Sequence, residues 1–156
     1  MIIRRAQALA PALMLLAVFV APSAAADTAE DCAILRKASG EYAKLAVDLA
    51  NLRKTADAQE QADDIAALTA TQRKIVDLAR TIGGKLHALQ VQMKNPALEY
   101  AYKTDAASFN TYADTLEGAI NNGDVAATNI HVTRAYSRNR ETVEATNDTY
   151  HEQCGK

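Results

Sequence analysis

The sequence predicts an all-α protein, an antiparallel four-helix bundle with up-down-up-down topology. After residue 27 the chain contains one proline, Pro96, and no stretch in which apolar and polar residues alternate as they do in a strand. The apolar residues instead recur three and four positions apart, which is the spacing of one helix face. The segments between these stripes are short, and short connections favour antiparallel neighbours.

The first 26 residues are typical of a secretory signal peptide. A basic start, "MIIRR", precedes the apolar run "ALMLLAVFV", and small residues stand at Ala24 and Ala26. We therefore predict cleavage before Asp27, a mature domain over 27–156, and a location in the periplasm. The apolar run is too short for a membrane-spanning helix, and the rest of the chain has no long apolar stretch, so we expect no membrane span after cleavage.

The first bundle helix is expected to begin at Asp27, where Asp27 and Glu30 form a pair like a capping box, and to end near "KTAD" at residues 54–57. Asp57 and Glu60 repeat that signal and predict a second helix from Asp57 to Lys94. That helix would be about 57 Å long against about 40 Å for the first. The pair Gly83-Gly84 is therefore predicted to end or kink it.

The third helix is expected to begin at "NPALEY", with Asn95 as the N-cap and Pro96 at the first helical position. "INNGD" predicts its end, with Gly123 in the left-handed conformation and Asp124 as the N-cap of the fourth helix. That last helix is expected to run to about Cys154.

The two cysteines of the chain lie near the two ends of the mature domain. In an up-down-up-down bundle, the start of the first helix and the end of the fourth lie at the same end of the molecule. Two cysteines brought together in an exported chain predict a disulfide, Cys32–Cys154. The alternative is two free thiols, which would leave both available to a metal or haem.

Other chemistries have little support in the sequence. His151 and Cys154 stand at i and i+3, but two ligands do not make a metal site, and His87 and His131 are isolated. We predict no metal site and no catalytic residues, since no nucleophile elbow or phosphate-binding loop occurs. Without Arg4 and Arg5 the net charge falls from −2 to about −4, and no basic patch suggests nucleic acid as a partner.

Several polar residues occupy stripe positions where a core residue is expected. Either they line a polar pocket together with tyrosines, or they lie at the edge of a stripe that drifts around a straight helix, which is the interpretation that we favour. The polar residues are Gln72, Asp105, Asn129 and Asn139, and the tyrosines are Tyr42, Tyr102, Tyr112 and Tyr136.

Three short segments resemble a known family. "ADTAEDC" at residues 26–32, "TNDTYHEQ" at 146–153 and the turn "NNGDVAA" at 121–127 are similar to the soluble periplasmic cytochromes b of the cytochrome b-562 family, exported four-helix bundles related to the cytochromes c-prime. The resemblance covers roughly the terminal thirds of the mature chain. It implies a protein that binds haem b for electron transfer, not an enzyme, with a redox partner in the envelope.

The same resemblance assigns the haem ligands. In the family, a methionine near the start of the first helix and a histidine near the end of the last ligate the iron, and the matching positions here are Cys32 and His151. Met93 is the only methionine of the mature chain and matches no family position. Cys32 would ligate only if reduced. "YHEQC" lacks the Cys-x-x-Cys-His run of covalent attachment, so covalent haem is not expected.

A second interpretation needs no cofactor. The mature chain would then be a disulfide-linked helical bundle of the envelope, a monomer or weak dimer, that binds a protein partner or a small ligand. In that case His151 is an exposed histidine beside the disulfide.

Overall fold

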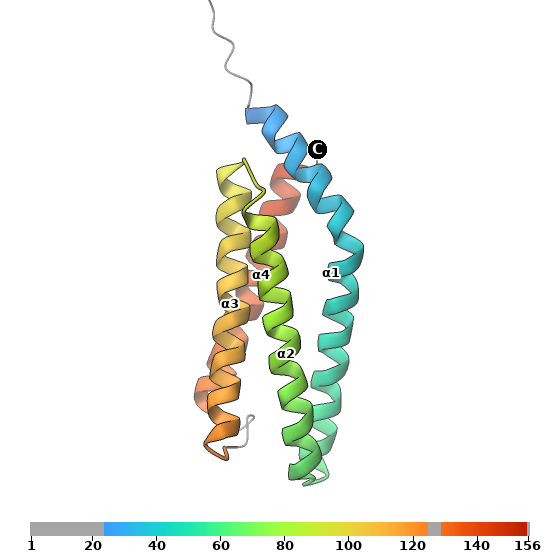
Figure 1. The fold of residues 1–156 in the computed structure, drawn as a ribbon, viewed down its shortest axis with the longest axis vertical. Coiled ribbons are helices and arrows are strands. Elements are labelled where there is room, and N and C mark those ends of the chain that lie inside the picture. Colours follow the sequence, from blue (N-terminus) through green and yellow to red (C-terminus); the bar gives the residue numbers. More distant parts are fainter. Residues whose placement is uncertain (1–23, 125–128, 156) are drawn as a thin grey trace, which may run out of the picture.

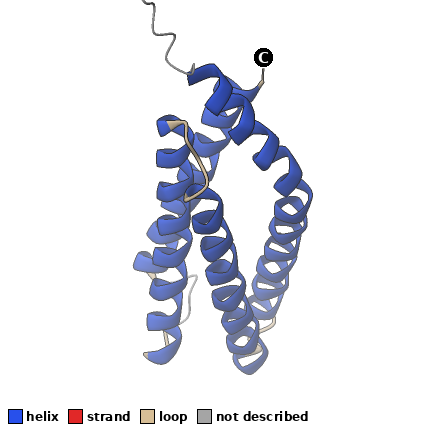
Figure 2. Cartoon of the chain, turned by 45° about the horizontal axis from the view of Figure 1, so that its top comes forward, coloured by secondary structure: helices blue, strands red, loops and turns tan. Residues whose placement is uncertain are grey.

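A computed structural model describes residues 24–124 and 129–155, which form four α-helices. They are α1 (Ala24–Gln61), α2 (Ile65–Gln90), α3 (Pro96–Asn121) and α4 (Ile130–Cys154). Figure 1 shows the helices side by side, with the start of α1 leaning over the end of the bundle at which α4 finishes. Figure 2 shows only helices and short connections over these residues. The predicted four-helix bundle is confirmed.

The boundary between α1 and α2 differs from the prediction. α1 continues through residues 54–57 to Gln61, and the N-cap of α2 is Asp64, whose side chain accepts a hydrogen bond from the backbone N–H of Ala67 at 3.0 Å. The segment at 54–57 holds no glycine or proline to stop a helix, whereas aspartate tolerates the left-handed conformation that Asp63 adopts, with φ of 54°. The predicted start at Asp57 is therefore wrong.

The ends of α3 follow the sequence signals, and the start of α4 does not. Asn95 caps α3 and accepts hydrogen bonds from the N–H groups of Ala97 and Leu98, and Gly123 has φ of 75°. The N-cap of α4 is Asn129 rather than Asp124, and its side chain accepts from the N–H groups of residues 131 and 132. The amide of Asn129 also donates to the Asp124 carboxylate at 3.0 Å. The part of the predicted fourth helix at 125–128 lies outside the described residues.

The core follows the apolar stripes of the four helices in two clusters. The larger cluster fills most of the bundle, and Leu116 and Ala113 of α3 lie at its centre. The smaller lies at the disulfide end, where Leu98 is fully buried. α2 and α3 pack closely along their length, whereas α1 and α4 touch each other far less. No helix within 24–124 and 129–155 has an apolar stretch long enough to cross a membrane.

Gly83 and Gly84 do not end α2, which is a continuous helix from Ile65 to Gln90. Because α1 extends to Gln61 and α2 begins at Ile65, α2 has 26 residues, about as many as α3, and α1 with 38 residues is the long helix instead. Gly83 serves a different purpose. A Cβ at this position would lie 3.1 Å from the backbone oxygen of Ala106 and closer still to the side-chain oxygen of Asn110, so the missing side chain lets α2 approach α3.

The two glycines provide a matched test of that role. Gly84 is exposed and a Cβ there would meet nothing within 4 Å, so Gly84→Ala should gain about 1 kcal/mol of helix propensity. Gly83→Ala gains the same propensity but must push α2 from the Ala106 carbonyl, and overpacking costs about 1–3 kcal/mol. In urea unfolding, the free energy of unfolding of Gly84→Ala should therefore exceed that of Gly83→Ala by about 1–3 kcal/mol. Equal stability of the two variants would contradict the close approach.

Candidate functional site

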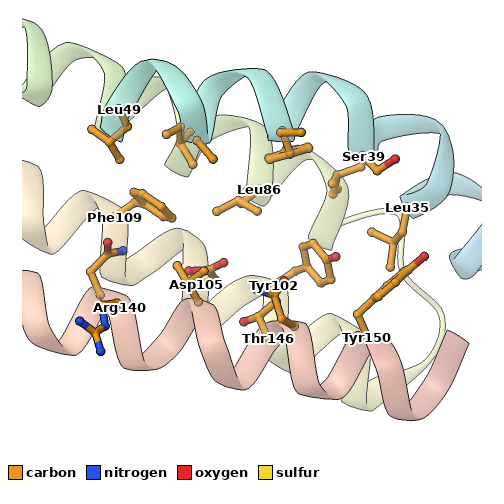
Figure 3. A pocket seen from close by; sticks show the side chains of 18 of the residues that line it. Leu35, Ser39, Leu49, Leu86, Tyr102, Asp105, Phe109, Arg140, Thr146 and Tyr150 are labelled. Atoms are coloured by element: carbon orange, nitrogen blue, oxygen red, sulfur yellow. The ribbon is translucent and has the colours of Figure 1, made fainter. Parts of the chain in front are cut away.

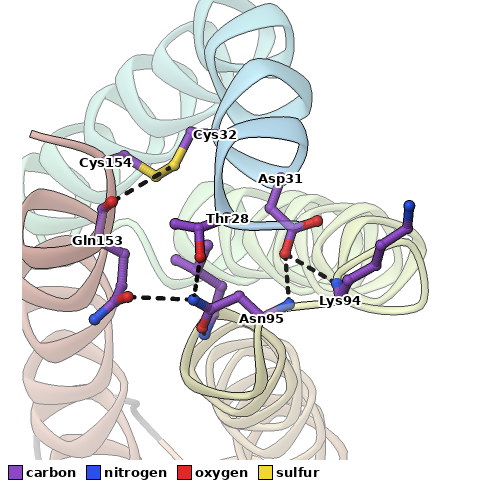
Figure 4. Close-up of a disulfide and its surroundings, with 8 residues drawn as sticks. Thr28, Asp31, Cys32, Lys94, Asn95, Gln153 and Cys154 are labelled. Atoms are coloured by element: carbon purple, nitrogen blue, oxygen red, sulfur yellow. Dashed lines mark hydrogen bonds between the residues drawn. A yellow bond between two sulfur atoms is a disulfide. The ribbon is translucent and has the colours of Figure 1, made fainter. Parts of the chain in front are cut away.

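The two cysteines meet at the end of the bundle. Cys32 on α1 and Cys154, the last residue of α4, form a disulfide with a Cα–Cα distance of 5.5 Å (Figure 4). Both belong to or pack against the smaller core cluster. The predicted pairing is confirmed, and no cysteine within the described residues is left as a free thiol.

A hydrogen-bond network beside the disulfide was not predicted. The side chain of Asp31 is completely buried, and its Oδ2 accepts hydrogen bonds from the backbone N–H groups of Lys94 and Asn95 at 2.9 and 2.7 Å (Figure 4). The amide of Asn95 donates to Thr28 Oγ1 and to Gln153 Oε1. The start of α1, the α2–α3 connection and the end of α4 are thus joined. No local signal marks Asp31, because its partners are more than sixty positions away in the sequence.

The two residues assigned to haem by resemblance lie at the disulfide end of the bundle, where one is exposed and the other is bonded. His151 is exposed on α4, and its ring contacts Tyr150 edge to face with centroids 5.6 Å apart. The Cys32 sulfur is bonded to Cys154. The isolated His87 and His131 are also exposed. Among the described residues, no group of three or more His, Cys, Asp or Glu is placed to hold a metal ion.

A cavity lies between the helices instead. It has a volume of about 460 Å³, and Figure 3 shows side chains from all four helices pointing into it. Its floor is formed by buried apolar residues of α2 and α3, and its mouth by exposed residues of α1 and α4, where these helices touch least. The floor comprises Ile82, Leu86, Leu89 and Phe109, and the mouth comprises Ser39, Ala43, Ala46, Arg140 and Asn147.

Two of the polar stripe residues line this cavity. Asp105 and Asn139 are 5% and 2% exposed, and Tyr42 and Tyr102 lie in the same lining. Gln72 is also buried and lines a smaller hollow of about 210 Å³ with Tyr112 and Tyr136. The edge interpretation is therefore wrong for Asp105, Asn139 and Gln72, because neighbouring helices cover their side of the stripe. Asn129 lies at neither place, since it is the N-cap of α4.

Asp105 has few polar contacts for a buried carboxyl group. The Ser108 hydroxyl lies 3.4 Å from Asp105 Oδ1 but only 2.8 Å from the Asp105 backbone oxygen, and it accepts a hydrogen bond from the Asn139 amide at 2.9 Å. Burial raises the pKa of Asp105 to about 7, and the Ser108 hydroxyl only partly opposes the rise. Burial also raises the pKa of Tyr102 to about 12 and that of Tyr42 further.

Arg53 separates the cavity from the smaller hollow and lines both. Its guanidinium carbon lies 4.2 Å from the ring centroid of Tyr136 and 5.1 Å from that of Tyr112, which is cation–π geometry. Its Nε and Nη2 atoms are buried and have no hydrogen-bond partner among the described residues. The charge of Arg53 is thus held by aromatic faces rather than by a carboxylate.

The fold and the cavity together define a class of protein, a disulfide-linked four-helix bundle with a largely apolar interhelical cavity that contains one buried carboxyl group. Comparison of the chain with protein-family models, with curated proteins and with solved structures gives no match. The features that bear on function are therefore the cavity itself and the resemblance of the two chain ends.

Proposed function

We propose that this protein is a non-catalytic binding protein of the periplasm that holds a small, largely apolar molecule in the cavity between α1 and α4. The observation that carries the proposal is the cavity, which has the size and the mainly hydrophobic and aromatic lining of small-molecule sites. Of its polar groups, Asp105, Asn139 and Tyr102 are the ones we expect to orient a ligand.

The packing of the helices supports this use of the cavity. α2 and α3 form a closely packed floor, while α1 packs mainly against α2 and is joined to the end of α4 by the Cys32–Cys154 disulfide. α1 and α4 otherwise touch little, so a ligand can enter without breaking the core. Burial of the ligand's apolar surface would contribute roughly 25 cal/mol of favourable free energy per Å².

The test is a titration of purified protein, with its disulfide intact, with the neutral fluorescent probe N-phenyl-1-naphthylamine. We expect saturable binding of one probe per chain. Ala46→Phe places a ring at the mouth and should weaken binding at least tenfold, whereas Ala58→Phe, on an exposed position of α1 outside the cavity lining, should bind like the wild type. Weak, unsaturable fluorescence that is the same in all three proteins would refute the proposal.

Haem b binding with electron transfer is the second candidate, and the apolar cavity and the resemblance of the chain ends support it. The assigned ligands do not fit the group in this arrangement, because His151 is exposed and absent from the cavity lining and Cys32 is in a disulfide. Purified protein is therefore also titrated with haemin. A one-to-one Soret band that disappears in His151→Ala would favour the cytochrome function over the first proposal.

A further inference from the structure

We propose that the ligand of the cavity is an organic ammonium cation with an apolar body, and that the Asp105 carboxylate binds its charged head. The inference rests on the proposed function, since it assumes that the cavity is a ligand site, and it adds the chemical class of the ligand. Its basis is a buried carboxyl group with no cationic partner among the described residues, placed among aromatic rings inside a largely apolar cavity.

Asp105 has an unused oxygen that faces the cavity. Oδ1 has only the long contact with Ser108, and Oδ2 has no hydrogen-bond partner among the described residues. Oδ2 is not fully enclosed, so this atom retains accessible surface although the residue as a whole is only 5% exposed. Figure 3 shows the Asp105 side chain inside the space between the four helices. A group bound in the cavity can reach this oxygen.

No cation of the described residues forms an ion pair with this carboxylate. The ion pairs within 24–124 and 129–155 are all formed by exposed side chains, and none includes Asp105. A buried carboxylate without a partner is costly, and its cost is relieved by protonation or by a cation. A ligand that supplies an ammonium group would provide that cation, together with N–H donors for Oδ2.

The surrounding rings favour a cation over a neutral head. Tyr42 and Tyr102 both interact electrostatically with Asp105, and Tyr150 and Phe109 complete the aromatic part of the lining. Aromatic faces attract ammonium groups, and the attraction grows as the cation is desolvated. The same chain already uses tyrosine faces in this way, for Arg53.

An anionic ligand is the competing class, and the cations of the lining serve it poorly. The guanidinium of Arg53 is covered by two tyrosine rings, and its Nε and Nη2 atoms are enclosed. Arg140 is at the exposed mouth and pairs with Glu144 at 3.2 Å. A ligand carboxylate in the cavity would also lie beside Asp105. The chain as a whole carries a net charge of −2, which attracts cations.

The test uses three probes with the same apolar body and different heads, namely octylammonium, 1-octanol and octanoate, measured by calorimetry at pH 8. We expect octylammonium to bind at least tenfold more tightly than either of the others. Asp105→Asn keeps the shape of the side chain and should abolish that preference. Asp148→Asn removes the same charge from an exposed position of α4 and should behave like the wild type.

The outcomes separate this inference from the proposed function. If none of the three probes binds, the cavity is not a ligand site and both proposals fail. If octanol binds as tightly as octylammonium, the proposed function stands and the ammonium class is wrong. If octanoate binds best, the class is anionic and Arg53 becomes the anchor. A preference that persists in Asp105→Asn would assign the ammonium site elsewhere.

The pH dependence provides an independent readout. The titratable and charged groups of the lining are Tyr42 and Arg53 from α1, Tyr102 and Asp105 from α3, and Arg140 and Tyr150 from α4, with none from α2. Tyrosine, arginine and an alkylammonium do not change charge between pH 5 and pH 8. Burial raises the pKa of Asp105 to about 7, so octylammonium must displace its proton at lower pH. Affinity should therefore weaken about tenfold per unit between pH 6.5 and pH 5. Constant affinity would exclude Asp105 as the anchor.

Discussion

Replacing Cys32 and Cys154 together by alanine is expected to lower the free energy of unfolding by about 4 kcal/mol. The disulfide joins residues 122 positions apart, and the chain-entropy model gives on the order of 4–5 kcal/mol for a loop of that length. Alanine is chosen because Cys32 is buried, so a serine hydroxyl would add its own cost. The loss is large compared with the typical stability of a single domain, about 5–15 kcal/mol.

The measurement is urea unfolding of the wild type and of the double variant, followed by far-UV circular dichroism. Wild-type protein with a reducing agent is the matched control, since it loses the bond and keeps the side-chain volume, and it should unfold close to the double variant. Hydrogen exchange should show the loss first at the start of α1, where the bond joins it to the end of α4. A decrease below about 1 kcal/mol in both samples would show that the bond contributes little.

Asp31→Ala is expected to have the second largest effect, a loss of about 3 kcal/mol. The substitution leaves the backbone N–H groups of Lys94 and Asn95 without their acceptor, and each hydrogen bond to a charged group contributes about 1.5–3 kcal/mol. It also removes a completely buried side chain from the end of the core. Asp31→Asn keeps one acceptor oxygen and should fall between the alanine variant and the wild type.

Glu30 offers a matched control for this experiment. It precedes Asp31 in the sequence and its Oε2 contacts the Nζ of the same Lys94 at 2.6 Å, but both side chains are at least half exposed. Surface ion pairs contribute little, so Glu30→Ala should unfold at nearly the same urea concentration as the wild type. If the two alanine variants were equally stable, the stabilising role assigned to the buried hydrogen bonds would be incorrect.

The cavity and the bonds at the end of the bundle have related consequences for stability. An apolar cavity forfeits packing contacts, and its cost grows with its volume. Here α1 lies over the cavity without close support from α4, so its position depends on its packing against α2, on the disulfide and on the contacts of Asp31 with the α2–α3 connection. Loss of either link should therefore weaken probe binding as well as stability.

The sequence by itself determined the fold class and much of the topology. Helical spacing of apolar residues is a local pattern, and the caps at Asn95 and Gly123 act on their own neighbours, so both can be recognised without a structure. The Cys32–Cys154 pairing follows from the topology alone, because an even number of antiparallel helices returns the chain to its starting end. The signal peptide over 1–26 and the periplasmic location remain predictions from sequence.

Only the tertiary structure decided which polar positions are covered and what the glycines do. Whether Asp105 or Asn139 is an edge residue depends on how closely a second helix approaches, and periodicity within one helix holds no information about that distance. Gly83 acts on α3, and Asp31 acts on a connection more than sixty positions away, so neither partner is marked locally. The cavity arises because α1 and α4 stay apart while α2 and α3 pack closely, and such spacing is set by all four helices together.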